Sequence, residues 1–244
     1  MNSYENKTIA DIVTENINTA KVFEKYKIGF GFEDDQKLKS VCKKTNVDIS
    51  EICNELSHTH PNNFYLRDYN SWDLDLLITF LIEVHHDKIK HDLKLLKIVD
   101  NLIKKEFSED KLILKKCELT HILSNELTLK MKREEIIIFP YIKKLQAIIE
   151  KHINNDLKRP YLKQQLHILD IEREQVSIDL REILELTVEM QSTKIEEEKF
   201  NYLHSKLKQF YFDIQLHNHI EKNILLPKAL KLEEILLSEI TNKY

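Results

Sequence analysis

Glycine is almost absent from this chain, and that scarcity limits the possible folds more than any other feature. Only Gly29 and Gly31 occur among 244 residues, and the four prolines are Pro61, Pro140, Pro160 and Pro227. A sheet of several strands needs tight turns, and glycine supplies the backbone conformations that many of these turns require. The sequence therefore predicts an all-α fold.

Charge, hydropathy and cysteine usage exclude several classes of protein. The 37 basic and 41 acidic residues nearly balance, and no basic run is interleaved with aromatic residues, so no nucleic-acid partner is expected. The longest nearly apolar run, LLITFLI at 76–82, is too short to span a membrane, and no secretory signal is apparent. The three cysteines (Cys42, Cys53, Cys117) form no CxxC, which favours a reduced, cytoplasmic protein.

Two parts with different patterns follow one another along the chain. Residues 1–57 carry short helical patterns around KIGFGFEDD and predict a small helical N-terminal domain. Residues 58–70 are polar and are expected to form a linker, in which solvation explains the His58-x-His60 pair better than metal binding does. Residues 71–244 predict an antiparallel four-helix bundle.

The bundle pattern divides into four long helices and a terminal segment. Ser71 is expected to cap the first helix, the second is expected to open at Ser108, and Thr193 with Glu196 predicts a capping box for the fourth. Pro160 suits the first turn of the third helix. The expected helices cover residues 72–105, 108–151, 160–189 and 193–226, and the terminal segment covers 228–241.

Each long helix has a row of apolar residues at steps of three and four, the spacing of a face turned to the core. Every row is interrupted by polar residues at one level. In the second helix the row is expected to continue through Ile137 and Tyr141. The interrupting residues are His86, Lys130 with Glu134, Arg173, and His217 with Glu221.

The spacing of these interruptions is repeated. His86 and Lys130 are 44 residues apart, and so are Arg173 and His217. Each half of the bundle therefore places one polar residue on its first helix and a pair four residues apart on its second. Residues four apart share one face of a helix, so six polar groups are expected to converge at one depth.

Each interruption also has an ordinary interpretation. His86 alone could be a hydrogen-bonded core histidine, and Lys130 and Arg173 could extend to water at the rim. His217 and Glu221 are harder to explain in this way, because together they offer two metal-binding side chains on one face. Buried charges are costly unless they are paired or bind a metal, so the joint pattern predicts a site. Three flanking histidines are expected to face solvent or to support the ligands: His85, His91 and His219.

These segments resemble the repair-of-iron-centres family. SWDLDLLITFLIEVHH at 71–86 is similar to the family's first bundle helix, and EEIIIFP at 134–140 and HNHIEKNILLPKAL at 217–230 are similar to its two glutamate–proline segments. The stretch from TIADIV to AKVFEKYKIGF resembles the family's small N-terminal domain. The resemblance covers nearly the whole chain. It implies a hemerythrin-like bundle that holds two irons with four histidines and two bridging glutamates.

The chain departs from this family at residues that carry chemistry. Lys130 and Arg173 stand at two ligand positions where the family has histidine, and neither charged side chain offers a lone pair to iron. Gly31-Phe32 replaces the cysteine pair that the family carries in its N-terminal domain. The resemblance places the remaining metal ligands at His86, Glu134, His217 and Glu221.

Two designs of the site fit this residue set. In the first, two histidines and two carboxylates bind one iron, while the two cations occupy the place of the second ion. In the second, no metal binds, and two cations and two carboxylates compensate each other. Retention of the histidines favours one ion over none, and a site for two ions is not expected.

The resemblance implies a stress-response protein that binds iron and repairs iron–sulfur clusters after oxidative or nitrosative damage. The alternative is a metal-free, salt-bridged bundle that acts as a scaffold or interaction protein. Hemerythrin-like oxygen binding is a third, weaker hypothesis, because two ligands are missing. Nothing in the sequence indicates a conventional enzyme active site. Iron–sulfur proteins are the expected clients, no membrane partner is expected, and a homodimer stays open.

Overall fold

The computed structural model describes residues 4–32, 34–59, 68–150, 157, 160–190 and 196–241. These residues form helices joined by short connections, with one isolated antiparallel bridge between Thr8 and Lys37, so the predicted all-α class is confirmed. Across the described ranges, no helix has the length and apolar character needed to cross a membrane. Most of the predicted linker, including His60, lies outside the described residues.

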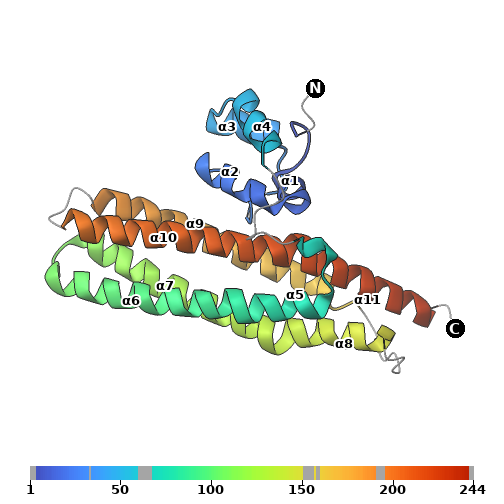
Figure 1. Ribbon diagram of the computed structural model, residues 1–244. Helices are drawn as coiled ribbons and strands as arrows, with labels where there is room; N and C mark the ends of the chain where they lie inside the picture. Colours follow the sequence, from blue (N-terminus) through green and yellow to red (C-terminus); the bar gives the residue numbers. More distant parts are fainter. Residues whose placement is uncertain are drawn as a thin grey trace.

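The N-terminal part consists of four short helices, which lie against one side of the long bundle (Figure 1). Thr8 begins the first helix through a capping box, because its hydroxyl accepts the Asp11 N–H and the Asp11 carboxylate accepts the Thr8 N–H. Asn46 ends the third in the left-handed conformation that commonly terminates helices. The helices are α1 (Ile9–Glu15), α2 (Ala20–Lys25), α3 (Leu38–Thr45) and α4 (Ile49–Ser57), with a 3-10 turn η1 at Ile17–Thr19.

Long helical rods lie side by side in the bundle (Figure 1). Among the described residues there are four such rods, and three of them contain a π-helical turn. After a 3-10 turn η2 (Tyr69–Ser71), the first rod joins α5 (Leu74–Phe80), the π turn η3 (Leu81–His86) and α6 (Asp87–Glu106). The second joins α7 (Lys111–Arg133), the π turn η4 (Glu134–Ile138) and α8 (Phe139–Glu150). The third is α9 (Leu162–Glu189). The fourth joins α10 (Glu197–Ile220), the π turn η6 (Glu221–Leu225) and α11 (Leu226–Thr241).

The helix starts differ by a few residues from the predicted ones. Asp73, rather than Ser71, caps α5, and Asp110 caps α7 after the expected start at Ser108. Each aspartate accepts hydrogen bonds from N–H groups of the first turn, which a carboxylate does at least as well as a serine hydroxyl. The third rod starts at Leu162, just beyond Pro160, and the fourth at Glu197, while Thr193 lies outside the described residues. The predicted terminal segment continues the fourth rod without a break.

Pro140 and Pro227 lie inside rods, although proline normally ends a helix. Each follows a π turn in which an N–H bonds to a carbonyl five residues back: Phe139 to Glu134, and Leu226 to Glu221. In a regular α-helix the proline ring would collide with the carbonyl four residues before it. The wider turn relieves that collision, and the repeated Glu-x5-Pro pattern therefore marks two equivalent structures.

The π turn also shifts the core row of the second rod by one residue. Ile137, expected in the core, is 47% exposed, whereas Ile138 is fully buried. An additional residue in the turn rotates everything after it about the helix axis, so the apolar row passes from Glu134 to Ile138. The prediction for Ile137 was wrong for this reason.

The N-terminal helices dock on the fourth rod through the glycine-bearing loop. The Phe30 N–H donates to the side-chain oxygen of Gln215 at 3.0 Å. A Cβ at Gly31 would lie 2.0 Å from the backbone oxygen of Gln215, so no other residue fits there without displacing the loop. Asp34 then accepts hydrogen bonds from Lys222 and Asn223, each at 2.7 Å. The loop is therefore anchored on α10 and on the π turn that follows it.

Candidate metal centre

Six polar side chains form one layer across the bundle between two apolar clusters. On α9, Leu169 belongs to one cluster and Val176 to the other, with Arg173 between them. All six are buried, with at most 3% of their surface exposed. They are His86, Lys130, Glu134, Arg173, His217 and Glu221, the residues that interrupt the core rows of the sequence.

Three of the six form a cluster of potential ligand atoms. The Nε2 atoms of His86 and His217 are 3.1 Å apart. Glu134 Oε2 lies 3.0 Å from the first and 3.7 Å from the second. Two ligand atoms at right angles around an ion with bonds of about 2.1 Å would be about 3.0 Å apart. These separations therefore fit three ligands on one side of a single ion.

The orientation of the two imidazoles strengthens this interpretation. His86 Nδ1 lies 2.8 Å from the Glu135 carboxylate, and His217 Nδ1 lies 3.3 Å from the side-chain oxygen of Asn218. Both partners are acceptors, so each Nδ1 carries the proton that it donates, and each Nε2 keeps its lone pair. A carboxylate that orients a metal-binding histidine in this way is a frequent feature of metal sites.

The result is three acceptor atoms that face one another in the protein interior. Glu134 Oε2 makes no hydrogen bond with any described residue, although it is fully buried. Such an arrangement leaves lone pairs unsatisfied unless a shared proton or a metal ion lies among them. Two imidazoles and one carboxylate are a donor set suited to Fe(II), and the residues present fit one ion.

The other half of the layer is a compensated ion cluster. The Lys130 ammonium donates to Glu134 and, at 2.9 Å, to Glu221, and Arg173 lies 3.3 Å from the same Glu221 oxygen. Burial alone would raise the pKa of the Glu221 carboxyl, but Lys130 and Arg173 outweigh it and lower that pKa. Burial likewise opposes the charge of Lys130, yet Glu134 and Glu221 raise its pKa. All three groups are therefore charged at neutral pH.

The layer thus contains an element of each of the two designs that the sequence left open: a trio of potential ligand atoms and an ion cluster. Glu134 serves both halves, since one oxygen faces the histidines and the other accepts from Lys130. Glu221, expected to be a ligand, faces the two cations and is not among the three residues whose ligand atoms all lie within 4.8 Å of one another. Arg173 also reaches Asp170 at 2.7 Å, toward the surface of α9.

The sequence interpretation missed Glu135, which orients His86 and is itself held by Lys90 at 2.9 Å. The signal was the glutamate doublet at 134–135, whose second residue lies off the core row. Of the three flanking histidines, His91 is exposed, whereas His85 and His219 are buried, so for these two the expected alternative is support of the ligands rather than exposure to solvent. His85 is buried beside His217, with ring centroids 5.9 Å apart, and burial lowers its pKa to about 4. His219 is fully buried near Thr14 and Asp34.

The three π turns of the described residues all lie at this layer. His86 is the last residue of η3, Glu134 the first of η4, and Glu221 the first of η6. A π turn costs hydrogen-bond quality relative to an α-helix, and such turns occur often at functional sites. Three of them at one depth therefore mark the layer as specialised, independently of its side-chain chemistry.

Comparison with known proteins finds one matching family model and several similar proteins. Residues 5–60 match the family described as a domain of unknown function (DUF542). Over 232 residues the chain is 24% identical to the iron-sulfur cluster repair protein YtfE of Yersinia pseudotuberculosis serotype IB, strain PB1/+. The same identity and length hold for the iron-sulfur cluster repair protein YtfE of Yersinia pestis, strain Pestoides F. Each comparison covers 94% of this chain and 99% of the relative.

Proposed function

The chain belongs to the repair-of-iron-centres family, and on that premise we propose that it binds one iron and serves in the repair of damaged iron–sulfur clusters. The observation that carries the proposal is the trio of His86 Nε2, His217 Nε2 and Glu134 Oε2, whose lone pairs face one point in the interior. The protein acts after oxidative or nitrosative stress has damaged these iron–sulfur clusters.

Each residue of the layer has a distinct task in this proposal. His86, His217 and Glu134 hold the ion, which would supply open coordination positions for oxygen, nitric oxide or water. Lys130 and Arg173 occupy the space of two further ligands and present fixed positive charge there. Glu221 neutralises these cations rather than binding the ion, because both lie within 3.3 Å of one of its oxygens.

A second iron is excluded by the same cations. An ion placed beside Lys130 and Arg173 would meet two positive charges at short range and no lone pair from either side chain. Lys130 also keeps its proton and therefore its positive charge, because the adjacent carboxylates of Glu134 and Glu221 raise its pKa. The site therefore supports one ion per chain.

Metal analysis tests the proposal directly. We expect the full chain, loaded with Fe(II) without oxygen and desalted, to retain about one iron per chain. H86A and H217A should each abolish retention, and H91A, which changes an exposed histidine of the same rod, should not. Two irons per chain would refute the argument from Lys130 and Arg173.

A metal-free scaffold is the second candidate, and the compensated cluster of Lys130, Arg173, Glu134 and Glu221 favours it. Two cations and two carboxylates sum to zero, so this cluster needs no ion for neutrality. Absence of retained iron, and of any charge-transfer absorption after Fe(II) and air are added, would support this candidate against the first.

Two further assignments follow from the proposed repair role. The partners are proteins that carry iron–sulfur clusters, and binding of a purified cluster protein to the iron-loaded chain tests this. We place the protein in the cytoplasm, since Cys42, Cys53 and Cys117 are all free thiols. Fractionation of cells that produce the chain checks the location.

A further inference from the structure

A series of aromatic rings leads from the six-residue layer toward the start of the first rod. The ring of His85 lies beside that of His217, with centroids 5.9 Å apart. Phe80 follows at 5.1 Å from His85, and Trp72 at 5.2 Å from Phe80. All three contacts are T-shaped, and their spacings lie within the range of favourable aromatic pairs. The series therefore joins a residue of the candidate metal centre to Trp72 through neighbouring rings.

The two ends of the series differ in exposure. His217 and His85 are buried, whereas Trp72 is partly exposed just before α5 begins. Lys228 of α11 donates to the Trp72 carbonyl at 2.6 Å, which holds the backbone of Trp72 against the fourth rod. The rings therefore extend from the interior of the bundle to its surface, and both ends of the series are fixed in position.

The second histidine of the trio has no such continuation. His86 stacks on Phe139, with centroids 5.8 Å apart, and Phe139 is only 1% exposed. Within the described part of the chain, no further ring contact involves Phe139. The series of rings that reaches the surface therefore begins at His217.

His85 is the unusual member of the series. Its Nε2 atom is buried and makes no hydrogen bond with any described residue, and such an unsatisfied group costs free energy. A phenylalanine would fill the space between Phe80 and His217 without that cost, so packing alone does not explain the imidazole. An imidazole gives up electrons more readily than a benzene ring, and it therefore mediates electron transfer better than phenylalanine does.

Trp72 is the member of the series that loses an electron most readily. Indole and phenol rings are oxidised by one electron far more easily than benzene rings are, so Phe80 mediates transfer without holding the charge. The chain contains a single tryptophan, and Tyr69 packs against it with ring centroids 4.9 Å apart. Because the rate of electron transfer falls steeply with distance, short steps between neighbouring rings favour transfer between Trp72 and the layer.

We propose that Trp72 supplies an electron to the metal centre through this series of rings when a peroxide oxidises the bound iron. The inference rests on the proposed function, because it requires iron at the trio of ligand atoms. Hydrogen peroxide accepts two electrons and two protons and yields two water molecules. Fe(II) gives one electron and becomes Fe(III). Trp72 gives the other electron together with its indole proton, which leaves a neutral radical, and solvent supplies the second proton.

The transfer protects the ligands of the metal centre. When Fe(II) reduces hydrogen peroxide by one electron without a second donor, the products are hydroxide and hydroxyl radical, which attacks nearby side chains. An electron from Trp72 completes the reduction to water instead. Oxidation of His86 and His217 is therefore expected to increase when Trp72 is replaced.

Freeze-quenched electron paramagnetic resonance tests the transfer on the full chain, loaded with Fe(II) without oxygen and then mixed with hydrogen peroxide. An organic radical is expected, and growth on deuterated tryptophan should change its hyperfine splitting, because the label enters only position 72. W72F should lose this radical, and the iron-free protein should not form it. H85F should lower the radical yield and H85L should lower it further, since leucine fills the space without a ring. Iron content and circular dichroism are measured for each variant.

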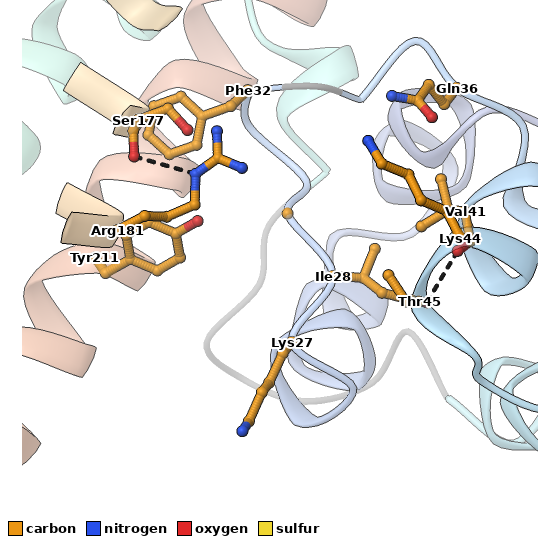
Figure 2. A pocket seen from close by; sticks show the side chains of 11 residues that line it. Lys27, Ile28, Phe32, Gln36, Val41, Lys44, Thr45, Ser177, Arg181 and Tyr211 are labelled. Carbon is orange, nitrogen blue, oxygen red and sulfur yellow. Dashed lines mark hydrogen bonds between the residues drawn. The ribbon is translucent and has the colours of Figure 1, made fainter. Parts of the chain in front are cut away.

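Tyr211 provides a matched control. Figure 2 shows Tyr211 and Phe32 at a cavity that residues of the N-terminal part and of the bundle line together, and their ring centroids are 5.9 Å apart. Tyr211 is partly exposed and oxidisable, as Trp72 is, but the described ring contacts do not join this pair to His217. Y211F should therefore leave the radical at Trp72 unchanged.

Several outcomes would overturn the inference. Iron that is retained and oxidised without a radical would remove this inference alone, whereas a chain that retains no iron would remove the proposed function as well. Equal radical yields in H85L and the unaltered chain would exclude His85 from the series. A radical that ignores the label and disappears in Y69F would assign the electron to Tyr69 instead of Trp72. Peptide mass spectrometry gives a second readout, and unchanged oxygen addition at the ligand histidines in W72F would contradict the protective role.

Discussion

Lys130 and Glu221, which lie 91 residues apart in the chain, form an ion pair of 2.9 Å in the interior of the bundle. The pair links the second rod to the fourth at the depth where both contain a π turn. Glu221 also contacts Arg173, whereas the ligand atoms that all lie within 4.8 Å of one another belong to His86, His217 and Glu134.

Restoring imidazoles should create a second metal position. In the double variant K130H/R173H, two neutral side chains with lone pairs replace two cations, and Glu221 is released to bind an ion. Iron retained after anaerobic loading should rise from about one to about two per chain. The matched control K130Q/R173Q removes the charges without supplying ligands and should show no gain. Failure of the histidine variant to gain iron would contradict the assigned ligand positions.

Removing the buried carboxylate should destabilise the metal-free protein strongly. E221Q leaves Lys130 and Arg173 with much of their charge uncompensated in the interior, and breaking a buried pair in this way costs roughly 3–5 kcal/mol. Urea unfolding followed by circular dichroism measures the change. E55Q breaks the exposed pair with Lys25 and should have a much smaller effect. Similar losses for both variants would mean that the buried cluster contributes no more than a surface pair.

Glu135 is predicted to act on iron affinity through His86. In E135Q the partner of His86 Nδ1 loses its charge, and loss of such a partner weakens metal binding by roughly 10–100-fold. Competition with a chromophoric chelator measures the affinity, and the free energy of unfolding of the metal-free protein should change little. E83Q, which alters an exposed glutamate of η3, is the matched control. Unchanged affinity in E135Q would remove Glu135 from the centre.

Gly31 should tolerate no side chain. In G31A the new Cβ would collide with the backbone of Gln215, which cannot move as a flexible side chain can, so a destabilisation of roughly 1–3 kcal/mol is expected. Limited proteolysis near the loop should also accelerate, since the loop anchors the N-terminal helices. G29A is the control, because its Cβ would lie 3.4 Å from the Gln215 side-chain oxygen. Equal stability of G31A and the unaltered chain would show that the loop adjusts freely.

The thiols should be unreactive at moderately alkaline pH. Burial raises the pKa of Cys117 to about 11, and burial also raises the pKa values of Cys42 and Cys53. The thiolate is the reactive form, so at pH 8 a pKa near 11 lowers its fraction roughly 100-fold relative to a pKa of 9. Alkylation with iodoacetamide should be slow at pH 8, accelerate as the pH is raised, and become fast at pH 8 in denaturant. Rapid labelling of the folded protein at pH 8 would contradict the burial of these groups.

The sequence was informative about the fold because its signals are regional. The lack of glycine and the steps of three and four recur over whole helices, so errors at single positions did not alter the predicted bundle. The convergence of the six polar residues was also predictable, since the separation of 44 residues repeats between the two halves.

The parts that escaped prediction depend on single hydrogen bonds. Whether a backbone N–H donates to the carbonyl four or five residues before it decides if Ile137 or Ile138 enters the core. The spacing of apolar residues in the sequence does not distinguish these two hydrogen-bond patterns. The division of the layer depends on which side chain Glu221 faces, and this requires the positions of two other rods. The docking of Gly31 on Gln215 joins segments almost two hundred residues apart, which periodicity within one helix does not reveal.

Pro140 and Pro227 restrict how the backbone can move at the polar layer. A rod that carries proline six residues after its glutamate cannot relax into a regular helix, because the ring would strike the carbonyl one turn before it. The proline thus maintains the π turn that begins at Glu134 and the one that begins at Glu221. The rods that bear His86 and Arg173 carry no proline beyond these residues, so their backbones lack this restraint at the layer.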